Sequence, residues 1–401
     1  MKKILRAVLI LTLTLNFLVL AGCGRKEKTT EILIGGIFDQ SGATSDVGAE
    51  YADGVIDYVR YVNENGGING RAVKLVYKDY AYKISEAYTW YEELERKGVI
   101  AIVGWGTGDT EALTPKITAD KIPFISGSYS DKLANGKNYP YNFIGATSYS
   151  DQARIGLKFI KNESKEPNPK VAFIYNDTAF GHSPFFPDAE NFAKEIGVNV
   201  VEKIVIPLSG AGAKEKLQIM EAQWAIVQET GTASVAIMKA LKELKKDTKL
   251  ILLNWAIDEN IAKQAGDIEP DMVYGIIPYG VWDDDLPGVK LLHEINAKYH
   301  PDVPERSCRY IQGYINIRII LEAVKMAGDD LRGEVIKEKL EDLENFDTGA
   351  SFNRVSFSNK IHKPSSSVMV YKLTGGKIVL RSQLLISIER KIWKEYQCSL
   401  P

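Results

Sequence analysis

The sequence predicts an α/β fold of two doubly wound parallel-sheet lobes, joined by a hinge that the chain crosses three times. Short apolar runs alternate with helix-length amphipathic segments, the pattern of βαβ units whose parallel sheet is buried on both faces. The alternation occurs in two separate series. The chain has 401 residues, of which 45% are hydrophobic, and a chain of this size supplies apolar surface for two cores.

The strands of each lobe are predicted from these apolar runs. The first series comprises residues 31–38, 72–80, 99–104 and 122–126, and the second comprises residues 170–177, 198–206, 224–229 and 249–256. The runs are separated by segments long enough for helices, so each series is expected to build one lobe.

The remaining segments predict how the chain passes between the lobes. Residues 141–153 and 272–288 are the first two crossovers, and two helical segments that follow would return to the first lobe. A third crossing then precedes the hairpin-like run 367–380, and residues 384–397 predict a helix docked on the second lobe. We therefore expect the first lobe to comprise residues 31–147 and 283–356, and the second to comprise residues 148–282 and 357–401.

The N-terminal residues predict export and a lipid anchor. Three basic residues precede an apolar stretch, 7–20, that is too short for a transmembrane helix and is typical of a secretion signal. The stretch ends in LAGC, which resembles the bacterial lipobox, where the cysteine thiol, here that of Cys23, receives a diacylglyceryl group. Residues 1–22 are thus the predicted signal peptide and residues 23–30 a tether, which places the mature chain on a membrane, in the periplasm or at the cell surface.

Two further cysteines, Cys308 and Cys398, leave their pairing open. In an oxidising compartment they either form one disulfide that ties the C-terminal tail to the body, or remain two unpaired, partly buried thiols. Their spacing in the sequence does not decide between these, because a disulfide requires the two residues to meet in space.

Charge and residue pattern exclude several classes of function. The net charge is −2 and no basic stripe interleaved with aromatic residues is found, which argues against a nucleic-acid partner. The four histidines are scattered along the chain: His182, His293, His300 and His362. The segment HEIN at His293 lacks the second histidine of a zinc-protease helix. We therefore expect no metal, no cofactor and no catalytic residues.

Residues 99–110, VIAIVGWGTGDT, pass from a β-branched run into a glycine-rich turn just before an apparent helix. Such a turn leaves backbone N–H groups at the positive end of the helix dipole, where an anion binds. A nucleotide is disfavoured because Asp109 would repel its phosphates and because the third glycine of the dinucleotide fingerprint is absent. Ligands of doubly wound lobes lie beyond the carboxyl ends of the strands, so this loop and the loop at 126–130 should face the cleft.

Residues 32–80 carry a further set of motifs: the first strand, the Ser41-Gly42 turn, Gly48, Gly54 and the phrase NENGGINGR at 63–71. With these motifs the chain resembles the type I periplasmic solute-binding proteins, the branched-chain amino-acid and amide class of substrate-binding lipoproteins of ABC transporters. The likeness extends more loosely over nearly the whole mature chain. It implies two lobes that close around a small polar solute and hand it to a membrane permease.

The resemblance also implies ligand contacts from the two first-lobe loops. Amino-acid binders of this family hold the solute carboxylate with a hydroxyl and backbone N–H groups of the first of these loops. By position, Thr107 and the backbone of Gly108 match that site, while Ser128 and Tyr129 match the second loop. Thr107 could instead cap the helix that follows it. Trp105, in the first loop, is a candidate aromatic contact.

For the second lobe the resemblance indicates five residues, with departures from the family pattern. Tyr149 lies at the first crossover, where it either contacts the ligand or packs in the hinge. Phe180 stands where amino-acid binders often have a tyrosine, so a hydroxyl is lost. Glu229 either pairs with a solute ammonium or is a solvated or helix-capping carboxylate. Trp255 lies near the position of the ammonium-binding acid, and the nearest acid is Asp258; the departures favour an aromatic or otherwise larger solute.

The sequence therefore predicts a lipid-anchored solute-binding protein of an ABC importer, not an enzyme. It is expected to bind an amino acid or a related small carboxylate or amide, aromatic ones included, in the cleft by hinge closure. The alternative is a receptor module of the same fold that signals to a membrane sensor partner. The expected partners are the small-molecule solute, an ABC permease and the membrane that holds the lipid, with the chain itself a monomer.

Overall fold

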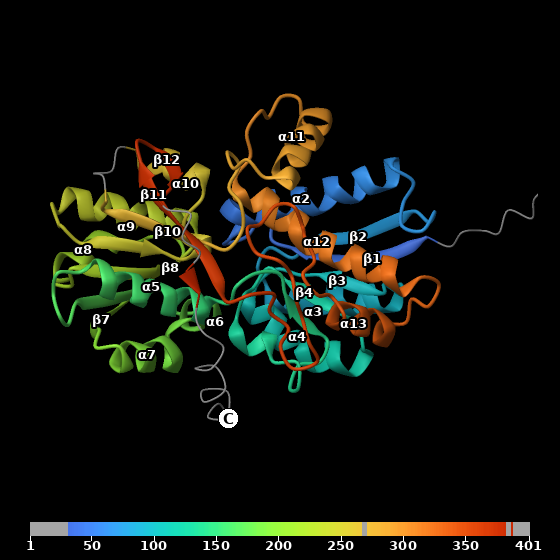
Figure 1. Cartoon of the computed structure of the whole chain (residues 1–401), viewed down its shortest axis with the longest axis horizontal. Helices are drawn as coiled ribbons and strands as arrows, with labels where there is room; N and C mark the ends of the chain where they lie inside the picture. The colour runs from blue at the N-terminus through green and yellow to red at the C-terminus, as the bar shows by residue number, and fades with distance from the viewer. Residues whose placement is uncertain (1–30, 267–270, 382–385, 388–401) are drawn as a thin grey trace, which may run out of the picture.

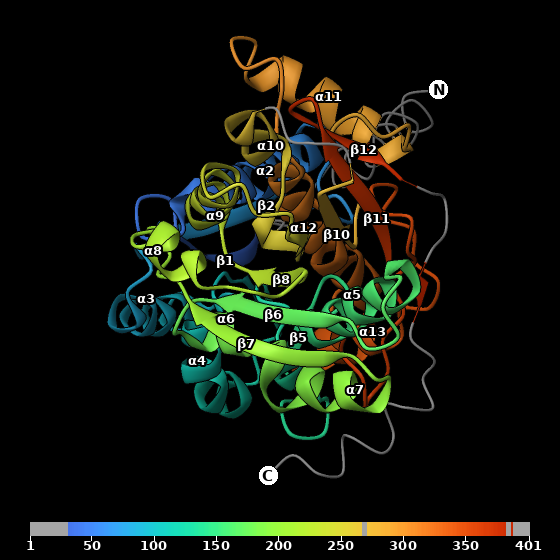
Figure 2. The ribbon, with the colours of Figure 1, turned by 90° about the vertical axis from the view of Figure 1, so that its left-hand side faces the viewer.

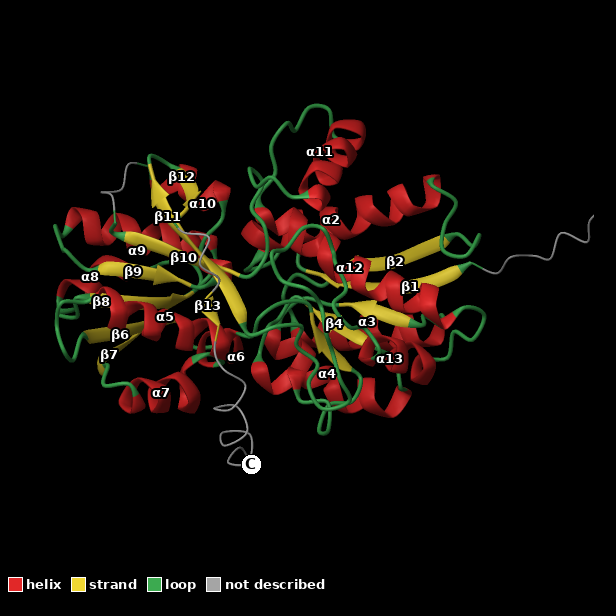
Figure 3. Cartoon of the chain, in the orientation of Figure 1, coloured by secondary structure: helices red, strands yellow, loops and turns green. Residues whose placement is uncertain are grey.

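A computed structural model describes residues 31–266, 271–381 and 386–387. It shows two lobes side by side, each a sheet of strands covered by helices (Figures 1 and 3). The predicted signal peptide, Cys23, the tether and Cys398 lie outside the described residues. The two-lobed α/β prediction is confirmed.

The sheet of the first lobe is parallel throughout, with the strand order β2-β1-β3-β4-β5. Its strands are β1 (Ile32–Phe38), β2 (Val73–Asp79), β3 (Ala101–Val103), β4 (Phe124–Ser126) and β5 (Asn142–Ile144). Strands β1 to β4 coincide with the four predicted runs. Strand β5 falls in the stretch that was expected to be only a crossover.

The helices of the first lobe come from both ends of the chain, as the hinge prediction requires. They are α2 (Ser45–Glu64), α3 (Ile84–Arg96), α4 (Thr107–Asp120), α11 (Pro287–Tyr299), α12 (Cys308–Ala327) and α13 (Gly333–Glu341), with a short turn η1 (Asp131–Ala134). Helices α2 and α12 approach closely at two glycines. A Cβ atom on Gly54 would lie 2.1 Å from the carbonyl oxygen of Tyr310, and one on Gly313 would lie 2.0 Å from that of Tyr51.

The sheet of the second lobe has the order β12-β11-β10-β9-β8-β6-β7, with β13 paired to β11. Its strands are β6 (Lys170–Tyr175), β7 (Asn199–Val205), β8 (Trp224–Gln228), β9 (Lys249–Leu252), β10 (Val273–Ile277), β11 (Ser367–Thr374), β12 (Lys377–Leu380) and β13 (Ile386–Ser387). Strands β6 to β10 are parallel, and the predicted hairpin forms the antiparallel pair β11-β12. The C-terminal helix prediction is wrong for residues 386–387, which pair with β11; the rest of residues 384–397 lies outside the described residues.

Helices cover both faces of this second sheet (Figure 2). They are α5 (Tyr149–Glu163), α6 (Ala179–His182), α7 (Glu190–Glu195), α8 (Ala213–Gln218), α9 (Gly231–Glu243) and α10 (Glu259–Ala265), with the short turns η2 (Phe185–Ala189) and η3 (Asn254–Ala256). Side chains alternate along each strand. Phe173 and Ile226 belong to the core shared with α5 and α7, whereas Ile174 and Val227 belong to the core shared with α8 and α9.

The chain passes between the lobes three times, as predicted. It does so between β5 and α5, between β10 and α11, and before β11 (Figure 1). Lys363 in the third passage is buried and joins the lobes. Its ammonium lies 2.9 Å from a carboxylate oxygen of Asp131 in the first lobe and 2.5 Å from one of Asp151 in the second. Between residues 31 and 381, as far as the chain is described, no helix is both long and apolar enough to cross a membrane.

Candidate functional site

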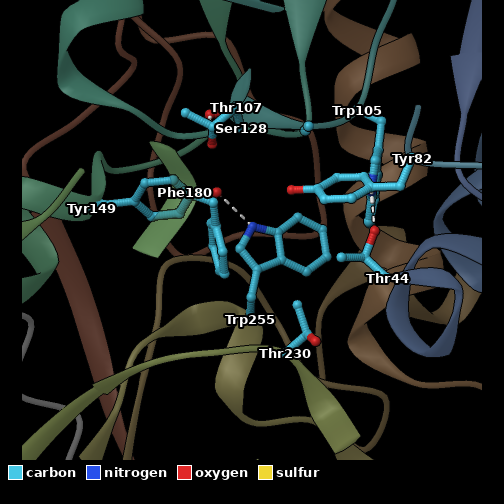
Figure 4. Close-up of a pocket in the computed structure, with 11 residues that line it drawn as sticks. Thr44, Tyr82, Trp105, Thr107, Ser128, Tyr149, Phe180, Thr230 and Trp255 are labelled. Carbon is cyan, nitrogen blue, oxygen red and sulfur yellow. Dashed lines mark hydrogen bonds between the residues drawn. The ribbon is translucent and has the colours of Figure 1, made fainter. Parts of the chain in front are cut away.

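A small cavity lies between the lobes at the carboxyl ends of the first-lobe strands. Its walls carry hydroxyl and aromatic side chains (Figure 4). The lining residues are Thr44, Tyr82, Trp105, Gly106, Thr107, Gly127 and Ser128 from the first lobe, and Tyr149, Phe180, Thr230 and Trp255 from the second. Parallel α/β sheets hold their ligands at this edge.

The N-terminus of helix α4 faces this cavity. Gly106 precedes the helix, and its N–H donates to a carboxylate oxygen of Asp109 at 3.3 Å, so Asp109 supplies the capping acid. Burial raises the pKa of Asp109 to about 6. Within the described part of the chain, the N–H groups of Thr107 and Gly108 have no acceptor. They and the helix dipole are therefore available to an anion in the cavity.

Three neutral hydroxyls gather beside this helix end. The hydroxyl oxygens of Thr107 and Ser128 are 2.6 Å apart, and the hydroxyl of Tyr149 lies near both. Burial raises the pKa of the Tyr149 hydroxyl well above its ordinary value, so this hydroxyl stays neutral. Hydroxyls donate to carboxylate oxygens readily. Together with the helix N-terminus they form a donor set that suits one carboxylate.

Aromatic rings form the remaining walls. The indole N–H of Trp255 donates to the Tyr149 hydroxyl at 2.8 Å, and that of Trp105 donates to the Thr44 hydroxyl at 2.9 Å. The rings of Trp105 and Trp255 meet edge to face with centroids 4.8 Å apart, and Phe180 packs against Tyr149. Because both indole N–H groups are used, these rings offer apolar surface to a ligand.

The lobes also touch outside the cavity lining. Asp46, in the first turn of α2, accepts hydrogen bonds from the backbone N–H and the hydroxyl of Thr232 in α9, at 2.7 and 2.9 Å. The amide of Asn260 donates to Glu50 of α2 at 3.1 Å. The structure is therefore that of a closed cleft.

A comparison with protein families assigns this architecture. The profile described as periplasmic binding protein matches residues 31–377. The chain belongs to the periplasmic binding protein family. Periplasmic binding proteins bind solutes and do not convert them, so this chain is a solute-binding protein that acts outside the cytoplasm, and not an enzyme.

Individual periplasmic binding proteins are similar to this chain over most of their length. The Leu/Ile/Val-binding protein homolog 7 of Brucella suis is 23% identical, and the alignment covers 89% of this chain and 92% of the relative. The crystal structure of an ABC transporter substrate-binding protein from Aeropyrum pernix is 28% identical with a TM-score of 0.84, over 92% of this chain and 100% of that chain. A branched-chain amino acid ABC transporter protein from Thermus thermophilus with bound valine has the same fold, with 23% identity and a TM-score of 0.84 over 91% and 99% of the two chains.

In this periplasmic binding protein, six of the ten residues predicted to contact the ligand line the cavity. They are Trp105, Thr107, Ser128, Tyr149, Phe180 and Trp255. Gly108 lies next to them in α4, with its N–H unpaired as described above. Tyr129 lies behind the wall, where its ring stacks on Trp255 and its hydroxyl accepts from the side chain of Gln312 at 3.0 Å.

Asp258 does not line the cavity, contrary to its predicted place near a solute ammonium. One of its carboxylate oxygens caps helix α10 by accepting from the N–H of Ile261 at 2.8 Å. The other lies 3.0 Å from the guanidinium of Arg309, which α12 of the first lobe supplies. Both residues are almost fully buried. The acid is neutralised by a residue from a distant part of the chain, which its own sequence neighbourhood does not reveal.

Glu229 is also absent from the lining, although it precedes Thr230, which is part of it. It is fully buried at the end of β8, where one carboxylate oxygen accepts from the amide of Asn176 at 2.9 Å and the other has no partner. Burial raises its pKa to about 8. The carboxyl is therefore largely protonated near neutral pH.

Glu229→Gln is expected to flatten the pH dependence of stability. Because the pKa of Glu229 is raised from 4.5 to about 8, the folded protein holds a proton that the unfolded chain releases between these values. This contribution to stability is present at low pH and is lost as the pH rises through that window. Melting temperatures measured across it should fall more steeply for the wild type than for the variant.

The comparison of wild type with variant isolates the contribution of Glu229, and a second variant serves as the control. Burial also raises the pKa of Asp109 to about 6 and of Glu259 to about 7, but these acids are common to both proteins. Glu166→Gln, which changes an exposed glutamate, should leave the wild-type curve unaltered. If the melting temperatures of the wild type and of Glu229→Gln fall in parallel as the pH rises, the pKa of Glu229 is not raised in the folded protein.

Sequence reasoning missed five lining residues: Thr44, Tyr82, Gly106, Gly127 and Thr230. Thr44 and Tyr82 follow β1 and β2, whose carboxyl ends share the edge of the sheet with β3 and β4. The carboxyl ends of β1 and β2 are therefore the signal in the sequence that indicates these two residues. Thr230 follows Glu229 in the sequence. The charge of Glu229 made it the candidate ligand contact of this loop, and Thr230 offers no comparable signal.

The described residues contain no group of three His, Cys, Asp or Glu side chains able to hold a metal ion. Cys308 is buried at the start of α12 and forms no disulfide with another described residue. Cys398 lies outside the described residues, so the pairing of these two residues stays a prediction.

Proposed function

We propose that this periplasmic binding protein is a lipid-anchored component of an ABC importer that carries an amino acid or a related small carboxylate or amide. The observation that carries the proposal is the donor set at α4, where two free backbone N–H groups and the hydroxyls of Thr107 and Ser128 face an aromatic cavity between the lobes. Such a set holds one carboxylate or one amide oxygen.

The similar proteins support the transport role. Those from Aeropyrum pernix and Thermus thermophilus are named for ABC transporters, and the Brucella suis relative is named for leucine, isoleucine and valine. All three align with this chain over nearly their whole length. We extend the transport role, but not a particular amino acid, to this chain.

Binding would proceed by hinge closure. The first lobe takes the solute carboxylate at α4, and the second lobe brings Trp255 and Phe180 over the remainder as it closes. The bonds from Thr232 to Asp46 form only when the lobes meet. A permease would then receive the closed, loaded form.

The solute class is tested by thermal-shift measurements on the purified chain with amino acids, aromatic carboxylates and their amides. At least one of these classes should raise the melting temperature in proportion to the logarithm of its concentration. Mass spectrometry of the ligand that co-purifies with the native protein identifies the compound. If no member of the three classes binds, the proposed function is wrong.

The anchor is tested separately. Lipid attachment at Cys23 follows from the lipobox-like LAGC, and Cys23→Ser removes the thiol to which the lipid would be joined. The wild-type chain should fractionate with membranes and the variant should not. A variant that stays in the membrane fraction would show that the anchor is not a lipid on this cysteine.

A further inference from the structure

We infer that the solute is a small carboxylate that carries a neutral hydroxyl or carbonyl group where an amino acid carries its ammonium. The inference rests on the proposed function and narrows it, because it accepts the carboxylate grip at α4 and concerns the opposite wall. Three observations support it: the lack of an acidic side chain among the described lining residues, the position of Arg309, and an unpartnered hydroxyl on Thr230.

None of the described residues that line the cavity has an acidic side chain. The acids around it already have other partners. Asp258 is paired with Arg309, Asp46 accepts from Thr232, and Asp109 caps α4. Glu229 is not among the lining residues; one of its carboxylate oxygens accepts from Asn176, the other has no partner, and burial raises its pKa to about 8, so the carboxyl is largely protonated at neutral pH. An ammonium enclosed in the closed cleft would therefore lose its water without gaining a counter-charge, which is strongly unfavourable.

The aromatic wall does not replace the missing acid. A cation can bind the face of an aromatic ring, but the guanidinium of Arg309 already lies over Trp255, with its central carbon 4.7 Å from the ring centroid. The Trp255 ring is thus already in contact with a cation, whose charge Asp258 balances. This wall suits a neutral group.

Thr230 presents a hydroxyl without a partner. It is the N-cap residue of α9, where a threonine side chain commonly accepts a hydrogen bond from the first turn of the helix, yet it makes no such bond. Asp46 from the other lobe takes that role by accepting from the N–H of Thr232. The Thr230 oxygen is left buried and unbonded on the cavity wall, where a ligand group can satisfy it.

The two polar sites lie at opposite sides of the cavity. Figure 4 shows Thr107 and Ser128 on one side, Thr230 on the other, and the indole of Trp255 between them. A solute held at α4 by its carboxylate thus meets the Thr230 hydroxyl with its second polar group. A hydroxyl or carbonyl oxygen pairs with that hydroxyl, whereas an ammonium would find one neutral acceptor and no charge.

The test compares matched solutes on the full-length chain purified in detergent. Isothermal titration at neutral pH would use phenylalanine, 3-phenyllactate and 3-phenylpropionate, and the corresponding leucine series. The 2-hydroxy acid should bind at least about tenfold more tightly than the amino acid with the same skeleton. An amino acid that binds as tightly as its hydroxy analogue, or tighter binding of glycine betaine, would overturn the inference while leaving the proposed function intact. Absence of binding by all acids and amides would overturn both.

A pair of variants assigns the preference to Thr230. Thr230→Val keeps the shape of the side chain and removes its hydroxyl, so affinity for 3-phenyllactate should fall about tenfold while that for 3-phenylpropionate stays within about twofold. Thr230→Ser should retain the wild-type preference. An equal loss for both acids in Thr230→Val would contradict a direct contact, and unchanged melting temperatures would show that each variant is folded.

Discussion

A chain in which Thr107 and Ser128 are both replaced by alanine is expected to bind its solute about 100-fold more weakly than the wild type. A hydrogen bond to a charged group contributes about 1.5–3 kcal/mol, so loss of two such bonds at the lower figure corresponds to roughly two orders of magnitude in Kd. The helix N-terminus remains, which is why some affinity should persist. Isothermal titration with the solute found in the screen measures the effect.

The matched control is the pair Ser85→Ala and Thr89→Ala, which removes the same two types of hydroxyl from the exposed face of α3. Its affinity should equal that of the wild type. If the Thr107 and Ser128 variant binds as tightly as this control, the carboxylate is held elsewhere and the site assignment fails.

Replacement of Arg309 by methionine is expected to lower the free energy of unfolding by about 3–5 kcal/mol, the usual result of leaving a buried charge without its partner. Arg309 is almost fully buried and satisfies Asp258 and the carbonyl oxygen of Ile257 in the second lobe, at 3.0 and 2.6 Å. It also donates to Gln312 at 2.8 Å. Because the residue stands on α12 of the first lobe, its loss weakens the contact between the lobes as well. Calorimetry or denaturant unfolding measures the change.

Asp258→Asn in the same chain should restore part of this loss, because asparagine removes the unpaired charge and still caps α10. Arg332→Met serves as the control, since its ion pair with Asp330 is exposed and should not affect stability measurably. If Arg309→Met were as stable as this control, Arg309 would not be the residue that neutralises Asp258.

Most strands of the first lobe could be predicted from the sequence, and β5 could not. Strand β1 has seven residues and is followed by turn residues and a long amphipathic helix. This pattern predicts the strand and the lobe to which it belongs. Strand β5 has three residues, Asn142–Ile144, and its place in the sheet depends on pairing with β4. Strands β3 and β4 also have three residues, but each stands within a longer apolar run, 99–104 or 122–126, whereas no such run surrounds β5.

The candidate site divides in the same way. Thr107 and Ser128 could be predicted because they follow strands, and the edge of a parallel sheet where strands end is a property of the fold class. The sequence could not show which acids face the cavity and which are hydrogen-bonded or ion-paired elsewhere. Glu229 and Asp258 were both reasonable partners for an ammonium, and only their neighbours in space show that neither faces the cavity.

The sequence by itself determined the class of this protein: the two series of βαβ units, the three crossovers and the glycine-rich turn that opens α4. These depend on interactions between residues close in the chain and on the period of apolar side chains. Only the tertiary structure decided the chemistry of the cavity. Arg309 reaches Asp258, and Asp46 reaches the N-terminus of α9 and leaves the Thr230 hydroxyl unbonded. Charges are neutralised and hydrogen bonds are satisfied by whichever groups the fold brings together, and these groups are far apart in the sequence.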